Sequence, residues 1–492
     1  MSSAAISMTS YENAIQQLSM LIPELFTAPS SGGGAPIRRK FSLDQIGILA
    51  EALGNPHLRF PSVLIAGTNG KGSTASTLAS IARVAGLRVG LYTSPHLERV
   101  NERIKFGGPE SSRGPDSGPI GSALLDIPDE TFGRLFFRVQ DAAQELVRTG
   151  RLPAFPSYFE LLTALAFLYF SEPVEGSGPV DLAILEVGMG GRLDATNLVS
   201  PILSVITDIS LDHQEWLGDS IAAITREKAG ILRRNGILVT LPQHPDANQA
   251  LGEAAVELDV RGVSAAGYIP QFRGIVPDQP YELEVMGQTI HIDSPLHGAH
   301  QHRNLALAIA AAVELAQNPE MPRRFPITPA AIEQGIHATQ WPGRLETIQI
   351  AGEPKFLLDV AHNPAGAWAL RAALNAATPE PSSKSGAVPI SQVLIFACLR
   401  DKPLREMTQI LFSIFDHVVL APIHSPRATD AADLAAAAEA TGVPYTAAGT
   451  VEEAIEMAES HHPARIVISG SLYLVGEART LLLKRKAMQG PA

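Results

Sequence analysis

The chain has 492 residues, of which 45% are hydrophobic, so it can bury more than one core, and two or three domains are expected. Its 38 basic and 50 acidic residues leave a net charge of -12, which argues against a nucleic-acid-binding protein. With a single cysteine, Cys398, no intrachain disulfide can form. Residues 1–30 carry no Lys or Arg, and no apolar run reaches the roughly 18 residues of a membrane span. We therefore expect a cytoplasmic protein that binds no membrane.

A glycine-rich turn follows an apolar run early in the chain. Val63–Ala66 can form a buried strand, and the glycines after it permit backbone torsions that leave N–H groups free to bind. A helix is predicted to begin near Lys71, so its positive end and the Lys71 ammonium would both attract a polyphosphate. Ser73 or Thr74 could then reach a magnesium ion. The sequence therefore predicts a phosphate-binding loop.

The loop departs from the common pattern G-x-x-x-x-G-K-[ST] at two positions. Residue 65 is Ile instead of Gly, and Gly72 separates Lys71 from Ser73. Taken alone, such a segment could also be a glycine-rich β-turn with an exposed lysine. The flanks favour phosphate binding, because a helical pattern follows and a strand at 88–92 completes a βαβ unit.

Hydrophobic periodicity predicts an α/β fold of two domains. The first, residues 1–337, is expected to have a parallel-sheet core, with the Gly-, Ser- and Pro-rich segment 107–128 as a surface insertion. The second and smaller domain, residues 338–492, alternates strands with helices as in a doubly wound, Rossmann-like fold. Strands are predicted at 62–66, 88–92, 180–186, 202–206, 355–359, 392–399, 417–421 and 466–469, and helices at 11–22, 43–53, 132–147, 161–170, 247–258, 403–415, 429–441 and 471–485.

Polar residues stand where several predicted strands end. Glu186 closes one strand, His213 follows the next, and Asp359 ends a strand of the second domain, with His362 in the turn after it. The carboxyl ends of parallel strands are where α/β folds bind ligands, and Glu186 stands where nucleotide-binding folds place a magnesium-linked acid. Glu186 or His213 alone could be structural, but their repeated placement at one edge favours a site.

Two further segments have ordinary explanations. Lys228 lies in a charged helical segment, 225–230, that would normally be a solvated face. His297, His300 and His302 invite a zinc site, but no fourth soft ligand is near, so a helix start that contacts nucleotide is preferred.

Taken together, these segments resemble the folylpolyglutamate synthase and dihydrofolate synthase family of the Mur ligase superfamily. The glycine after Lys71 is typical of this family. The insertion at 107–130, the N-terminal extension and the segment 378–390 match none of its motifs. The motifs that carry the resemblance run in order along nearly the whole chain: GTNGKGS at 67–73, TSPHL at 93–97, GGRLDATN at 190–197, DHQEWLG at 212–218, EKAGI at 227–231, HQHRN at 300–304, PGRLE at 342–346 and DVAHN at 359–363.

The resemblance implies an N-terminal P-loop, Mur ligase-like domain that binds ATP and a C-terminal glutamate-ligase domain. ATP would contact Asn69, Gly70, Lys71, Gly72 and Ser73, with Asn304, Arg344 and Asp359 at the domain interface. Two magnesium ions would involve Ser94, Glu186, His213 and a carbamylated Lys228. The pterin would lie near Ser157, Tyr158, Phe159, Glu160, Gly191, Arg192 and Leu193, and His362 would act on glutamate, beside the catalytic Lys71 and Lys228.

The implied reaction is ATP-dependent addition of L-glutamate to dihydropteroate and to reduced folates, through an acyl phosphate and by a monomer. A folylpolyglutamate synthase without the first activity stays open, because relatives with that activity alone share most of these motifs. The TSPHL and EKAGI segments disfavour a Mur-type ligase of cell-wall precursors. A P-loop switch ATPase would need no acid substrate, and the second domain with its DVAHN motif disfavours it.

Overall fold

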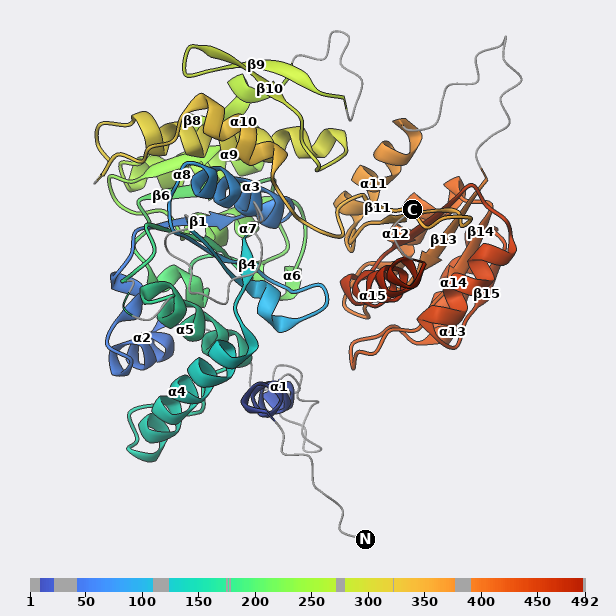
Figure 1. Ribbon diagram of the computed structural model, residues 1–492, viewed down its shortest axis with the longest axis horizontal. Helices are drawn as coiled ribbons and strands as arrows, with labels where there is room; N and C mark the ends of the chain where they lie inside the picture. The colour runs from blue at the N-terminus through green and yellow to red at the C-terminus, as the bar shows by residue number, and fades with distance from the viewer. Residues whose placement is uncertain are drawn as a thin grey trace.

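The computed structural model describes residues 9–21, 42–108, 124–173, 176, 178–270, 279–321, 323–376 and 391–489. These residues form two α/β units that lie side by side, a larger N-terminal one and a smaller C-terminal one (Figure 1). The chain passes between them after α10 (Pro329–His337) and before β11 (Glu346–Ile348). No helix within the described ranges combines the length and the apolar content needed to span a bilayer.

The N-terminal unit is built on an eight-stranded sheet with the order β4-β3-β2-β5-β1-β6-β7-β8. β1 pairs in parallel with both β5 and β6 and is buried along its whole length, which explains its uninterrupted apolar sequence. β3 and β4 run antiparallel at one edge. The strands are β1 (Ser62–Ala66), β2 (Val89–Tyr92), β3 (Ile104–Gly107), β4 (Leu125–Asp126), β5 (Leu182–Glu186), β6 (Leu203–Ile206), β7 (Ile237–Thr240) and β8 (Arg261–Ser264).

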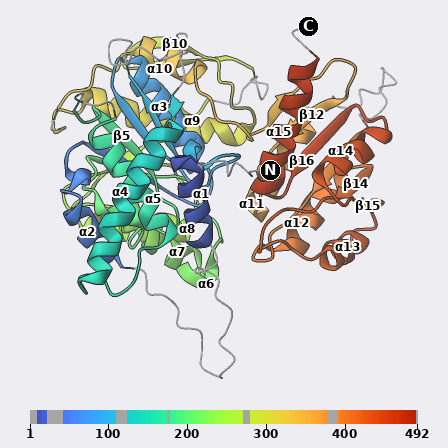
Figure 2. The same cartoon turned by 60° about the horizontal axis from the view of Figure 1, so that its bottom comes forward.

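Helices cover both faces of this sheet (Figure 2). One face packs against α3 (Lys71–Val84), α9 (Ala299–Gln317) and α10, beside the hairpin of β9 (Tyr281–Val285) and β10 (Gln288–Ile292). The other face packs against α2 (Leu43–Ala52), α4 (Asp129–Arg148), α5 (Tyr158–Ser171), α7 (Ile221–Ala229) and α8 (Pro245–Glu257). A short α6 (Gln214–Leu217) precedes α7, and α1 (Ser10–Leu21) packs on α4. Because α3 follows β1 directly, its N-terminus lies at the carboxyl edge of the sheet.

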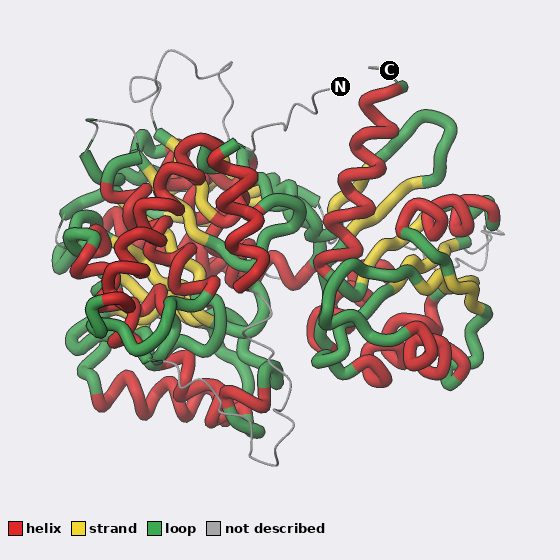
Figure 3. Tube along the Cα trace, turned by 90° about the horizontal axis from the view of Figure 1, so that it is seen from below, coloured by secondary structure: helices red, strands yellow, loops and turns green. Residues whose placement is uncertain are grey.

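The C-terminal unit has a six-stranded sheet with the order β11-β12-β16-β13-β14-β15, again between two layers of helices (Figure 3). All its strand pairs are parallel except β11 with β12. The strands after β11 are β12 (Lys355–Leu358), β13 (Gln392–Phe396), β14 (His417–Leu420), β15 (Tyr445–Ala447) and β16 (Arg465–Ser469). One face packs against α14 (Val451–Ser460) and α15 (Leu472–Met488), the other against α11 (Pro364–Ala376), α12 (Leu404–Leu411) and α13 (Ala431–Glu439).

The two-domain α/β architecture predicted from the sequence is confirmed. The elements that the sequence analysis missed include β3, β11, β15, α10, α11 and α14. β15 has three residues, two of them exposed, so it carries no apolar run. Most of the predicted insertion at 107–128 lies outside the described residues, but its end forms the edge strand β4. The boundary between residues 337 and 338 stays a prediction.

Candidate active site

A cavity of about 590 Å³ lies between the two units, and residues from both line it. Its walls come from the loops after β1, β5 and β6, the first turns of α3 and α9, the linker after α10, and the loop after β12. The predicted site residues that line it are Asn69, Gly70, Lys71, Gly72, Ser73, Ser94, Glu186, His213, Lys228, Asn304, Arg344 and His362. Residues far apart in the sequence therefore meet in one cavity.

The glycine turn is fixed against its neighbours at the carboxyl edge. The backbone N–H groups of Thr68 and Asn69 donate to the Asp208 carbonyl oxygen over 2.8 and 3.1 Å. Gly70 has φ 86°, and a Cβ there would lie 2.1 Å from Asn304 Oδ1. Only glycine fits this backbone conformation and this close approach without strain. The turn thus brings Asn304 of α9 directly beside the phosphate loop.

Glu186 is a buried carboxylate in the cavity wall, with 4% of the residue exposed. Its Oε2 accepts the backbone N–H of Ser94 over 3.2 Å. Burial raises the pKa of Glu186, and the positive charges of Lys71 and Arg344 offset part of that rise. A desolvated carboxylate beside a hydroxyl-bearing loop is suited to a hard cation such as magnesium, which needs few protein ligands because it keeps water and phosphate oxygens.

Lys228 is buried, contrary to the usual behaviour of a charged helical residue. Only 5% of the residue is exposed, and its Nζ donates to the Gly67 carbonyl oxygen over 2.7 Å. Burial, followed by the nearby Lys71 charge, lowers the pKa of Lys228 to about 7. A large fraction of this amine is therefore uncharged at neutral pH, which is the state that reacts with carbon dioxide.

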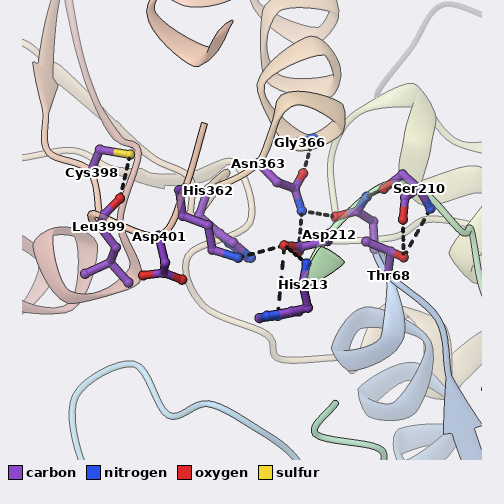
Figure 4. Close-up of polar contacts among 12 residues, drawn as sticks. Thr68, Ser210, Asp212, His213, His362, Asn363, Gly366, Cys398, Leu399 and Asp401 are labelled. Carbon is purple, nitrogen blue, oxygen red and sulfur yellow. Dashed lines mark hydrogen bonds and ion pairs between the residues drawn. The ribbon is translucent and has the colours of Figure 1, made fainter. Parts of the chain in front are cut away.

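Asp212 joins the two units at the side of the cavity (Figure 4). Its Oδ1 accepts from Lys402 Nζ over 2.9 Å and from the His213 backbone N–H over 2.9 Å. The Asn363 side-chain amide donates to Asp212 Oδ2 over 3.3 Å and to Asn69 Oδ1 over 3.0 Å. Burial raises the pKa of the Asp212 carboxyl, but Lys402 and His213 more than offset it, so the pKa lies well below its usual range. The C-terminal unit therefore touches both the phosphate loop and the loop of His213.

His362 and Asp359 take different positions at the end of β12. His362 lines the cavity, its Nδ1 is 2.8 Å from the Val360 carbonyl oxygen, and burial and then Lys402 lower its pKa to about 4. Asp359 does not line the cavity. Its carboxylate accepts the backbone N–H groups of Leu345 over 3.0 Å and Ala361 over 2.9 Å, so it fixes the backbone next to Arg344.

The predicted pterin residues also lie outside the cavity wall. Ser157 and Glu160 form the capping box of α5, with Ser157 Oγ 2.6 Å from Glu160 Oε2. Phe159 lies behind Gly188, where a Cβ would be 2.6 Å from its ring. Gly191 and Arg192 pack on α7, where the guanidinium of Arg192 pairs with Glu227 over 2.9 Å. Tyr158 lies under the Arg103 guanidinium, 5.3 Å from the ring centroid, and Leu193 is partly buried.

The three histidines near the start of α9 do not gather. His297 is exposed, His300 lines the cavity, and the ring of His302 lies 5.4 Å from that of Tyr281. Among the described residues, no group of three or more His, Cys, Asp or Glu side chains could hold a metal ion. The geometry thus gives no support to a zinc site.

Asp212 and Asn363 line the cavity, and Lys402 pairs with Asp212, yet the sequence analysis assigned a role to none of the three. Asp212 and Asn363 belong to the quoted DHQEWLG and DVAHN motifs, so their motifs could have pointed to them. Lys402 stands in a turn after β13 and had no such signal.

Comparisons with known proteins agree with this geometry. The Mur ligase middle domain matches residues 170–312, and the Mur ligase glutamate ligase domain matches residues 343–472. The chain is 34% identical to folylpolyglutamate synthase of Lacticaseibacillus casei, over 89% of this chain and 94% of the relative. It is 32% identical to dihydrofolate synthase/folylpolyglutamate synthase of Bacillus subtilis, over 88% and 93%. A structure of Mycobacterium tuberculosis folylpolyglutamate synthase with ADP and AMPPCP matches with a TM-score of 0.78 at 31% identity, over 96% of this chain and 99% of that one.

The two matched domains and the shared cavity define an ATP-dependent amide ligase of the Mur type. The chain also matches these relatives over nearly their full length, which narrows the class to one family. The chain belongs to the folylpolyglutamate synthase and dihydrofolate synthase family, as its motifs had indicated.

Proposed function

We propose that this chain adds L-glutamate to dihydropteroate, making dihydrofolate, and to the glutamate tail of reduced folates. The observation that carries the proposal is the cavity between the two units, in which the phosphate loop of one unit faces the His362 loop of the other. Folylpolyglutamate synthase activity alone is the second candidate. The L. casei relative bears only that name, whereas the B. subtilis relative bears both.

In the proposed reaction, a carboxylate oxygen of the acceptor attacks the γ-phosphorus of ATP, and ADP leaves. The glutamate nitrogen then attacks the acyl carbon, and phosphate leaves with the former carboxylate oxygen. Lys71 and the loop N–H groups would stabilise the transferring phosphoryl group. Asn304, Arg344 and Asp359 would serve the nucleotide, directly or through the backbone, and uncharged His362 would contact the incoming glutamate.

Magnesium at two sites, held with the help of Ser94, Glu186, His213 and a carbamylated Lys228, would neutralise phosphate charge when bound. The buried, low-pKa amine of Lys228 supports the carbamate. At pH 7 about half of such an amine is uncharged, against roughly one part in several thousand at an ordinary lysine pKa. Lys228 therefore meets the first requirement for reaction with carbon dioxide.

The carbamate is tested by removing and restoring carbon dioxide. Ligation by protein depleted of carbon dioxide should fall and return with bicarbonate, and ¹³C-labelled carbon dioxide should give one carbamate signal that Lys228→Ala lacks. A short carboxylate should partly restore activity to Lys228→Ala. Lys105→Ala, which breaks an ion pair with Asp126 at the sheet edge, is the control and should behave as the wild type. Activity indifferent to carbon dioxide, with no labelled signal, would rule the carbamate out.

The pterin is proposed to lie near 157–160 and 191–193, behind the Gly188 loop. Arg192→Ala tests this, because the Arg192 side chain is 55% exposed and its loss should leave the fold intact. We expect a higher KM for dihydropteroate with an unchanged melting temperature. An unchanged KM would remove Arg192 from the site. We also propose a monomer with domains at 1–337 and 338–492, acting in the cytosol, where ATP and magnesium are supplied.

The decisive experiment supplies ATP, magnesium and glutamate with one acceptor at a time and measures product mass. Lys71→Ala is the matched control for contaminating ligases. A mass gain of one glutamate on both acceptors supports both activities, and a gain on the reduced folate alone leaves folylpolyglutamate synthase. Phosphate release without any acceptor, and no ligated product, would favour a P-loop switch ATPase.

A further inference from the structure

The linker between the two units runs along α3 toward the phosphate loop. At Gly335 of α10, a Cβ would lie 2.4 Å from the Ile81 Cα, so α10 and α3 are in backbone contact. Closer to the start of α3, Ser76 Oγ donates to the Gln340 carbonyl oxygen over 3.1 Å. The next residue, Trp341, contacts Gly72 in the first turn. The linker therefore contacts α3 at three successive positions along the helix, and the last of them lies beside the phosphate loop.

The contact between Trp341 and Gly72 leaves no room for a side chain on the loop. A Cβ on Gly72 would lie 2.6 Å from Cζ2 and 3.0 Å from Cε2 of the indole. Neither partner can yield easily, because one is a planar ring and the other a helix backbone. The indole Nε1 is buried and finds no hydrogen-bond partner within the described ranges, so packing holds the ring.

Gly72 is also one of the two positions at which this loop differs from the common phosphate-loop pattern. We propose that Gly72 is a glycine because it receives the Trp341 ring, and that Trp341 is a positioning residue for the phosphate loop. The ring fixes the start of α3, and with it Lys71 and Ser73. Since Arg344 lines the cavity three residues later, the same linker ties the phosphate loop to the second unit.

A double-mutant experiment on the full chain tests whether residue 72 must be glycine to make room for the Trp341 ring or to make room for bound ATP. Gly72→Ala should lower kcat/KM for ATP at least about 100-fold, as expected when a phosphate-binding group is displaced. Trp341→Leu removes the edge of the ring, and we expect a several-fold rise in KM for ATP with a smaller change in kcat. Gly72→Ala combined with Trp341→Leu should regain about tenfold over Gly72→Ala. Gly252→Ala adds a Cβ into open space on α8 and should change nothing.

The kinetic measurements on these variants rest on the proposed function. Fluorescence supplies a second readout that does not depend on ligation. The chain has three tryptophans, and Trp216 and Trp368 are exposed, so changing both to Phe leaves Trp341 as the one tryptophan, whose emission can be excited apart from that of tyrosine. Magnesium-ATP should change its emission in proportion to bound nucleotide, and Gly72→Ala should shift the emission of the free protein. No recovery in the double variant, or emission indifferent to both changes, would overturn the proposal. Emission that responds to ATP in a wild type that ligates nothing would instead refute the proposed function alone.

Discussion

Replacing Lys402 with Met should open the cavity between the two units. Lys402 Nζ lies 2.9 Å from Asp212 Oδ1, and the two side chains are 6% and 12% exposed. Removing one partner of a buried ion pair costs about 3–5 kcal/mol, because the remaining charge has neither water nor a counter-charge. Asp212 would keep the His213 N–H and the Asn363 amide as donors, so we expect the lower end, about 3 kcal/mol.

This free energy should appear as separation of the units rather than unfolding, because separation returns Asp212 to water. A change of about 3 kcal/mol multiplies the ratio of open to closed protein by about 150. Ligation and acceptor-dependent phosphate release should fall together, because the phosphate loop of the opened protein loses the contact that Asn363 makes with Asn69. Product and phosphate release are measured together, and small-angle X-ray scattering reports the radius of gyration, which should increase.

Three variants control the experiment. Lys402→Arg keeps the charge and should stay closed, and Lys402→Met combined with Asp212→Asn removes both charges and should close again in part. Arg427→Met breaks the more exposed pair with Asp401 in the neighbouring loop and should cost no more than about 1 kcal/mol. If Lys402→Met ligates normally and scatters as the wild type does, the pair does not hold the units together.

Three further changes have expected outcomes. Lys71→Ala should lower ligation by about 100- to 1,000-fold, since one phosphate-stabilising group is lost, at an unchanged melting temperature; near-normal ligation would contradict the phosphate-loop assignment. Glu186→Gln should raise the magnesium concentration needed for half-maximal activity, because a carboxylate ligand is lost. The melting temperature should not fall, because the change removes a desolvated charge. An unchanged magnesium dependence would exclude Glu186 as a ligand. The folded-state pKa of Lys228, about 7, lies below the ordinary 10.5, so the unfolded chain binds more protons between these pH values. In the absence of magnesium and carbon dioxide, the unfolding free energy of the wild type should therefore rise more between these pH values than that of Lys228→Met. Denaturant titrations at several pH values measure both, and an equal rise with pH in the two proteins would contradict the burial of Lys228.

The sequence predicted those parts of the site that depend on local pattern. An apolar run followed by a glycine turn and a helix start defines β1, the phosphate loop and α3 within about twenty residues, whatever surrounds them. Glu186 was predictable in the same way, because a buried parallel strand ends there. Such features can be predicted from the rule that parallel strands present their carboxyl ends at one edge of the sheet.

Contacts between distant segments could not be predicted in this way. Lys402 and Asp212 lie 190 positions apart and in different units, so no period or spacing relates them. Lys228 has the composition of a solvated helical face, and its burial depends on how α7 packs beneath the Gly67 turn. Gly72 was visible as an extra glycine, but the reason for it, the Trp341 ring, is supplied by the linker between the units.

Contacts from the second unit and its linker converge on the loops that would hold phosphate. Asn363 binds Asn69 in the phosphate loop, Lys402 binds the residue before His213, and Trp341 packs at the start of α3. In the proposed mechanism the acyl phosphate would be lost to water if it formed before glutamate could reach it. Because the phosphate site is complete only when the second unit is in place, phosphoryl transfer should follow closure. This order makes the glutamate-binding unit part of the phosphate site, and it explains why interdomain residues should affect ATP chemistry as strongly as amide formation.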